Sequence, residues 1–120
     1  MKAKDLKIGN YIIDPNGGKL VQVFSLDNED DYLVINGFIE QHIKPKEISK
    51  EIFEKLGFEK TGDIEYSIYN EKEEYTFTVE FDGQYFWLSC GMSLKLSKNK
   101  KYVHELQNLF FEITGDELSF

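Results

Sequence analysis

The chain has 120 residues, the size of one domain, and 41% of them are hydrophobic, with 10 Phe and 7 Tyr. This composition is typical of a globular chain with an aromatic core and excludes intrinsic disorder. There are 22 acidic against 14 basic residues, for a net charge of −8, and every basic residue is a lysine. Arginine is the preferred side chain for bidentate hydrogen bonding to guanine and phosphate, and the chain has none. Direct reading of duplex DNA is therefore not expected.

The single cysteine, Cys90, leaves no pair for an internal disulfide and suits a reducing compartment. Residues 1–13 lack the apolar segment of a signal peptide. No apolar run approaches the roughly 18 to 20 residues that span a bilayer. We therefore expect a soluble protein of the cytoplasm, without a membrane partner.

The first half, residues 1–46, is predicted to fold into short antiparallel strands. Two strand candidates, residues 8–13 and 19–26, flank a turn at residues 14–18, where a proline presets φ and two glycines accept positive φ. The acidic residues 27–31 are predicted to form a solvated loop, because they lack the central glycine and the final acid of an EF-hand loop.

Asn36 and Gly37 separate the apolar residues 32–35 from residues 38–43. Asn-Gly is the strongest two-residue signal for a type I′ turn, so this segment is predicted to be a β-hairpin. Short strands joined by tight turns are typical of a small, strongly bent antiparallel sheet or of an SH3-like barrel.

A short helix is predicted to link the two halves. Ser49 is a suitable N-cap residue, and Ile48 before it can pack against Phe53 in the first turn. Gly57 is predicted to end the helix in the left-handed conformation, with Phe58 making the apolar contact that accompanies such an end.

The second half is predicted to continue as a three-stranded meander, over residues 63–69, 74–81 and 84–90. Asp82-Gly83 predicts a two-residue turn, which places Phe81 opposite Gln84. Because side chains alternate, one face of this meander is apolar core and the other is mixed. The residues predicted for the mixed face are Thr76, Thr78, Glu80, Tyr85, Trp87 and Ser89.

Residues 102–118 predict an amphipathic closing helix that ends at Gly115, with Leu118 folding back onto its last turn. The predicted apolar stripe consists of Tyr102, Val103, Leu106, Leu109, Phe110, Phe111 and Ile113. Such a stripe is expected to cover the core face of the meander. The sequence therefore predicts one α+β domain with two sub-halves, residues 1–46 and 47–120.

Two segments, YFWLS and YVHELQNLFFEITGDEL, carry a resemblance to an uncharacterised family of small proteins from Bacteroidetes phages, prophages and mobile elements. LKIGNYI, VINGFIEQHIKP and FEKLGFEK also match the layout of that family, so the likeness covers nearly the whole chain. The closing motif departs from the family pattern at Ile113 and Asp116, both conservatively. The resemblance implies a setting rather than a reaction: small acidic proteins of such elements often act on host machinery, including antiviral defence.

No motif for catalysis or for a metal or cofactor is present: there is no glycine-rich phosphate loop, no paired cysteine and no nucleophile elbow. The two histidines, His42 and His104, lie in different halves, and His104 is expected to bond a backbone carbonyl at the edge of the closing helix. We therefore predict no catalytic residue, no metal site, no cofactor and no enzymatic activity.

Two groups of residues are candidates for binding a ligand or a partner. Lys95, Lys98 and Lys101 precede the closing helix, where an anion would offset their charge, although solvation in water is the favoured alternative. Tyr85 and Trp87, beside Thr76 and Thr78, can stack a base or anchor a partner. Packing of these aromatic side chains inside the protein, or against a second subunit, is the favoured alternative.

Two functional hypotheses follow. In the first, the chain is a non-enzymatic phage protein that inhibits a host factor with a basic surface, with its acidic surface speeding the encounter. In the second, it is a small-ligand sponge that sequesters a signalling cyclic nucleotide, with the base on Trp87 or Tyr85 and the phosphates on lysines. A homodimer is expected in either case, because many aromatic residues tend to leave an exposed apolar patch.

Overall fold

A computed structural model describes residues 6–29, 32–39, 42–89 and 95–120. The architecture is α+β, as predicted, with antiparallel sheets and two helices. The chain divides into two compact units, Met1–Glu47 with Tyr102–Asn108, and Ile48–Lys101 with Leu109–Phe120. The closing helix α2 (Val103–Thr114) thus contributes its first residues to the first unit and its last ones to the second.

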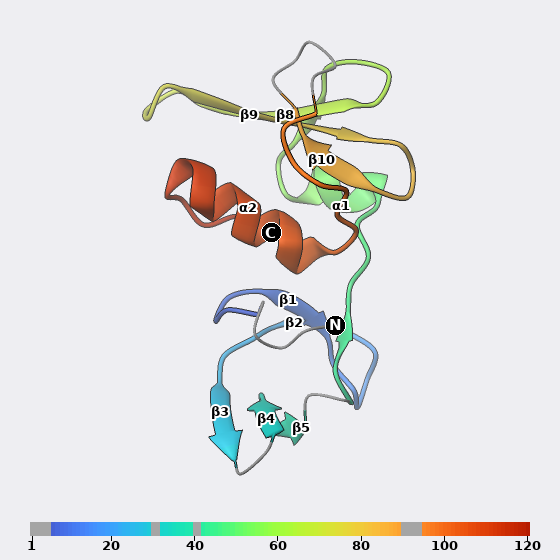
Figure 1. The fold of residues 1–120 in the computed structure, drawn as a ribbon, viewed down its shortest axis with the longest axis vertical. Coiled ribbons are helices and arrows are strands. Elements are labelled where there is room, and N and C mark those ends of the chain that lie inside the picture. Colours follow the sequence, from blue (N-terminus) through green and yellow to red (C-terminus); the bar gives the residue numbers. More distant parts are fainter. Residues whose placement is uncertain (1–5, 30–31, 40–41, 90–94) are drawn as a thin grey trace. The chain divides into compact units, whose positions relative to one another are not determined.

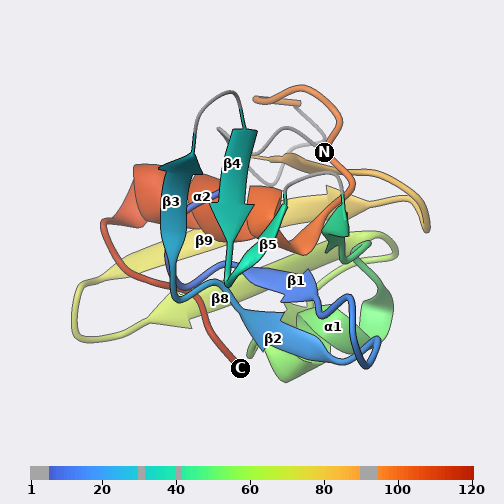
Figure 2. The same cartoon turned by 90° about the horizontal axis from the view of Figure 1, so that it is seen from below.

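The first unit contains two three-stranded antiparallel sheets (Figures 1 and 2). One has the order β2-β1-β6, with β1 Tyr11–Ile13, β2 Leu20–Gln22 and β6 Lys44–Pro45. The other has the order β3-β4-β5, with β3 Leu26–Glu29, β4 Tyr32–Ile35 and β5 Phe38–Ile39. The strands described for this unit therefore do not close into the SH3-like barrel that was one of the two predicted arrangements.

Both predicted turns of the first unit are confirmed. Between β1 and β2, the amide of Gly18 donates to the carbonyl oxygen of Asp14 at 2.8 Å, and Gly18 has a φ of +66°. Between β4 and β5, Asn36 and Gly37 have φ values of 51° and 85°, which is the type I′ geometry expected for Asn-Gly.

The predicted strand at residues 19–26 is confirmed only over β2, and the predicted acidic loop at residues 27–31 is wrong up to Glu29. Residues 19–26 divide between β2 and β3, because the Asn36 side chain takes the hydrogen bonds of the intervening backbone. Its Oδ1 accepts from the amides of Phe24 and Ser25, at 2.8 and 3.2 Å. The acidic residues then continue as β3 up to Glu29, and the remainder of that stretch lies outside the described residues.

The core of the first unit is aliphatic. Its buried members are Leu6, Ile12, Val23, Ile35 and Ile43. They come from both sheets, so the apolar faces of the two sheets share one core.

The second unit has one antiparallel sheet of order β10-β9-β8-β7, which is the predicted meander with one more short strand (Figure 1). The strands are β7 Glu59–Lys60, β8 Glu65–Asn70, β9 Tyr75–Phe81 and β10 Phe86–Leu88. Residues after β10 return along its outer edge, where the amide and carbonyl of Lys100 exchange two 2.8 Å hydrogen bonds with Phe86.

Helix α1 (Lys50–Lys55) begins and ends as predicted. The Ser49 hydroxyl accepts from the amide of Ile52 at 3.3 Å, and Gly57 has a φ of +94°. Beyond the glycine, the amide of Phe58 donates to the carbonyl oxygen of Phe53 at 2.9 Å, which is the long hydrogen bond of a Schellman motif. The two phenylalanine rings meet edge to face, 5.3 Å apart, and complete that motif with its apolar contact.

An aromatic cluster centred on Phe53 forms the core of the second unit. This ring is fully buried and stacks on Tyr66 from β8 at a centroid distance of 4.8 Å. Its edges meet Phe81 and Phe86, from β9 and β10, at 5.4 and 6.3 Å. A single helix residue therefore contacts three neighbouring strands.

The register between β9 and β10 differs from the predicted one. Phe86 pairs with Phe81 and Leu88 pairs with Val79, so the loop spans residues 82–85 instead of two residues. The carboxylate of Asp82 accepts from the amides of Tyr85 and Gln84, at 2.7 and 2.9 Å, and so stabilises the longer loop. Because the shift amounts to two residues, each side chain stays on its predicted face.

The same two hydrogen bonds, first the one from Tyr85 and then the one from Gln84, hold the pKa of the Asp82 carboxyl below its usual range. A lowered pKa in the folded state means that the ionised carboxylate stabilises the loop. This contribution is present at neutral pH and is lost as the pH falls through the folded-state pKa.

Helix α2 covers part of this core, as predicted. The Phe110 ring meets the rings of Phe77 and Tyr75 at 5.0 and 6.0 Å. The helix ends at Gly115, whose φ is +79° and whose amide donates to the carbonyl oxygen of Phe111 at 2.8 Å. Two members of the predicted stripe, however, are exposed: Phe111 by 45% and Ile113 by 57%.

Neighbouring phenylalanines of α2 provide a test of this packing. Phe110→Ala is expected to lower the free energy of unfolding by about 3 to 5 kcal/mol, because it leaves a cavity beside Phe77. The matched control, Phe111→Ala, should lower it by clearly less, because 45% of that side chain is exposed, against 2% for Phe110. Urea unfolding followed by circular dichroism measures both, and equal losses would show that the assignment of the two faces is wrong.

Candidate functional site

The face of the second sheet that points away from the Phe53 cluster carries a row of hydrogen-bonded hydroxyl groups. The Ser67 hydroxyl on β8 lies 2.9 Å from that of Thr78 on β9 and 3.2 Å from that of Thr61. These residues are brought together by the register, because Ser67 and Thr78 are direct cross-strand partners.

Two glutamates lie on the same face, each two residues along its strand from the Ser67–Thr78 pair. Glu65 and Glu80 are cross-strand partners on β8 and β9. Glu65 accepts a hydrogen bond from Thr61 at 2.8 Å, and the buried Glu80 accepts one from the hydroxyl of Ser89 at 2.9 Å. Each carboxylate is therefore oriented by a hydroxyl group on its own sheet.

Trp87 is an aromatic side chain of this face, and it is the direct cross-strand partner of Glu80. The ammonium nitrogen of Lys95 lies 5.0 Å from the centroid of its ring, within the range of a cation–π contact. We call Trp87, Lys95 and Glu80 the Trp87 platform. It brings an aromatic ring, a cation and a carboxylate together on one face, a composition suited to binding a ligand.

The other predicted site residues have separate positions in the second unit. Thr76 is exposed on β9, whereas Thr78 belongs to the hydroxyl row. Tyr85 is half-buried at the end of the loop before β10. Lys98 is exposed, and the carbonyl oxygen of Lys101 accepts from the amide of Ile48 at 2.8 Å.

Sequence reasoning did not include Glu65, Ser67 or Ser89 among the candidate site residues. The signal was available for the first two, because they alternate with Tyr66 and Ile68 along a predicted strand and so share one face. The predicted meander already paired this strand with residues 74–81, but the sequence did not show in which register.

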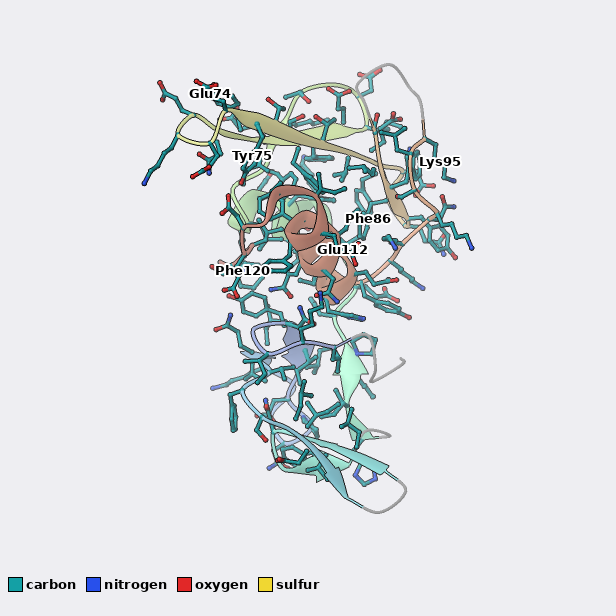
Figure 3. The ribbon with its side chains drawn as sticks, turned by 60° about the vertical axis from the view of Figure 1, so that its left-hand side comes forward. Glu74, Tyr75, Phe86, Lys95, Glu112 and Phe120 are labelled. Atoms are coloured by element: carbon teal, nitrogen blue, oxygen red, sulfur yellow. The ribbon has the colours of Figure 1, made fainter. Side chains whose placement is uncertain are left out.

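A second feature of this unit is a hollow of about 500 Å³ beside the β8–β9 hairpin, which we call the hairpin hollow. Its apolar lining includes Phe110 and Leu118. Three carboxylates also line it, from Glu73 in the hairpin turn and from Asp116 and Glu117 after α2. Figure 3 shows Glu74 and Tyr75 at this end of the sheet and Lys95 at the other end.

Tyr75 connects the two segments that form the hairpin hollow. Its hydroxyl donates to Oδ2 of Asp116 at 2.8 Å and lies 3.5 Å from the side-chain nitrogen of Asn70. The carboxylates of the hollow are therefore held near one another, although Glu73 and Asp116 are more than forty positions apart in the chain.

Polar residues at the start of α2 have a structural role in the first unit. The buried Gln107 accepts from the amide of Tyr11 at 2.8 Å and donates to the carbonyl oxygen of Gly9 at 3.1 Å. The side chain of Asn10 donates to Asn108 at 3.0 Å. His104 is buried and stacks on Tyr102, with ring centroids 5.8 Å apart.

Among residues 6–29, 32–39, 42–89 and 95–120, no group of three or more His, Cys, Asp or Glu side chains is placed to hold a metal ion. Within the same ranges, no helix is long and apolar enough to cross a membrane. No family model, no curated protein and no solved structure matches the chain.

The role of Gln107 can be tested by mutation. Gln107→Ala should lower the free energy of unfolding by about 1 to 3 kcal/mol, because the buried amide of Tyr11 loses its acceptor. The control, Gln84→Ala in the exposed loop before β10, should leave it nearly unchanged. Thermal and urea unfolding measure the difference. An unchanged melting temperature for Gln107→Ala would show instead that this part of α2 is not needed for stability.

Proposed function

We propose that this chain is a non-enzymatic binding protein of a phage or mobile element, and that it inhibits a host factor with a basic surface. The proposed host factor is a component of antiviral defence, in keeping with the setting that the sequence resemblance implies. The proposal places the protein in the cytoplasm of the bacterial host.

The carboxylates of the hairpin hollow are the observation that carries this proposal. Glu73 and Glu117 are exposed, and with Asp116 they line a concave surface that is mostly polar and that also includes Lys72. The three carboxylates outnumber this one lysine, so a basic side chain of a partner would gain charge pairing at the hollow. The net charge of −8 adds long-range attraction for such a partner.

Capture from host lysate tests this function. The immobilised protein should retain a basic host protein at low salt and retain less of it at physiological salt, because screening weakens charge steering. Glu73→Gln with Glu117→Gln should reduce capture, whereas Glu51→Gln with Glu54→Gln on α1 should not. Capture of no protein at low salt, or capture that is insensitive to both salt and the first pair of substitutions, would contradict the proposal.

The second candidate function is sequestration of a signalling cyclic nucleotide, and the contact between Lys95 and Trp87 favours it. A base that stacks on Trp87 would displace the Lys95 ammonium from the ring and leave it beside the phosphates. Lysine provides only a point charge, without the fork of an arginine, so this candidate ranks below the first.

A thermal-shift panel of cyclic nucleotides separates the two functions. A ligand at a hundred times its dissociation constant should stabilise the fold by about 2.7 kcal/mol. The shift should disappear in Trp87→Leu, and it should persist in Phe111→Leu, which changes an exposed ring of α2. If no cyclic nucleotide raises the melting temperature, the sequestration function is contradicted, and the proposed inhibition of a host factor is not affected.

Self-association is a further part of the proposal. Phe111, Ile113 and Phe120 are all exposed near the C-terminal end of the second unit, which favours a homodimer through this region or through the sheet face. Light scattering at high concentration should give twice the mass of 14.1 kDa. A clean monomer mass would contradict the dimer.

A further inference from the structure

The first unit has its own concave surface, which the proposed inhibition does not use. It is a groove of about 520 Å³, which we call the Phe24 groove. Two buried core residues, Ile12 and Ile43, form part of its lining, together with the rings of Phe24 and Phe38. Its volume is within the range of sites that bind small ligands or a few peptide side chains.

Phe24 is the feature of this groove that the fold does not explain. Its side chain is 71% exposed, the largest exposed fraction among the large apolar side chains that the structure describes. Burial therefore contributes little to keeping a phenylalanine at this position. A neighbouring surface that covered the ring would gain that burial.

The backbone that carries Phe24 is fixed in spite of this exposure. Asn36 accepts from the amides of Phe24 and Ser25, and its side-chain nitrogen donates to the carbonyl oxygen of Gln22 at 3.0 Å. The ring is thus presented from a backbone held by hydrogen bonds on both sides. Binding of a partner over this ring would therefore cost little conformational entropy, because the segment is already ordered.

The polar lining of the groove indicates the chemistry of the partner. Asp14 is the one charged side chain among the described residues that line it, and it is half-buried. The amide side chains of Asn16 and Gln22 lie on the same lining. A carboxylate beside aromatic rings suits a lysine or an arginine with an apolar neighbour, and amide groups suit the carbonyl groups of an extended backbone.

We propose that the Phe24 groove binds an extended, proline-rich segment of another protein, with an aliphatic or proline residue between Phe24 and Phe38 and a basic residue on Asp14. Such segments dock on aromatic-lined grooves because their polyproline II conformation is already extended and loses little entropy. The inference does not rest on the proposed inhibition, because it concerns the other unit.

The experiment is a titration of the full-length, ¹⁵N-labelled protein, followed by amide chemical shifts. The probes are two synthetic ten-residue peptides of proline and leucine that carry one arginine, or one glutamate at the same place. The arginine peptide should shift the amides of residues 22–25 and of Phe38, and the glutamate peptide should bind at least about tenfold more weakly.

Three variants sharpen the assignment. Phe24→Ser should weaken the arginine peptide by about tenfold or more, because it removes an aromatic anchor. Asp14→Asn should reduce the preference for arginine over glutamate. The control is Tyr69→Ser, which removes an exposed ring of the second unit, and it should bind the arginine peptide as the wild type does.

Several results would overturn the inference. They are the absence of shifts with the arginine peptide at millimolar concentration, equal binding of the two peptides, or shifts confined to the second unit. A change in oligomeric mass caused by Phe24→Ser would show that the groove is covered by a second copy of the chain instead. Failure of the lysate capture above leaves this titration unaffected, so the two proposals fail separately.

Discussion

Packing around the ring of Phe53 is the constraint on which the second unit depends. The ring is fully buried and contacts one residue from each of three adjacent strands, Tyr66, Phe81 and Phe86. Each strand must therefore direct a large ring toward the same point on α1. Because side chains alternate along a strand, this requirement also decides which residues point away from the core.

The polar face of the sheet follows from that requirement. Phe81 and Phe86 are cross-strand partners that both point toward Phe53. The next pair along these strands, Glu80 and Trp87, therefore points to the opposite face. On this face the hydroxyl row accounts for the hydrogen bond of Glu65, and the hydroxyl of Ser89 accounts for that of Glu80. The position of Glu80 and Trp87 on the outer face is thus a consequence of core packing.

In the first unit, polar side chains accept hydrogen bonds from backbone amides. Its two small sheets bury few large residues, and the segment between them has backbone amides that no strand can pair. Asn36 satisfies two of these amides, and Gln107 satisfies the amide of Tyr11 from a position far along the chain. Side-chain amides can do this because each carries both a donor and an acceptor. The hydrogen bonds of Asn36 also fix the backbone that carries Phe24.

The sequence by itself determined the features that depend on neighbouring residues: the turn at Asn36 and Gly37, the cap of α1 at Ser49, and the end of α2 at Gly115. It also determined the faces of β9 and β10, since alternation survives a shift of two residues. Only the tertiary structure decided the register of those strands, the pairing of Glu65 with Glu80, and the burial of Gln107. These depend on contacts between distant segments, whose free energies outweigh local preference and leave no periodic signal in the chain.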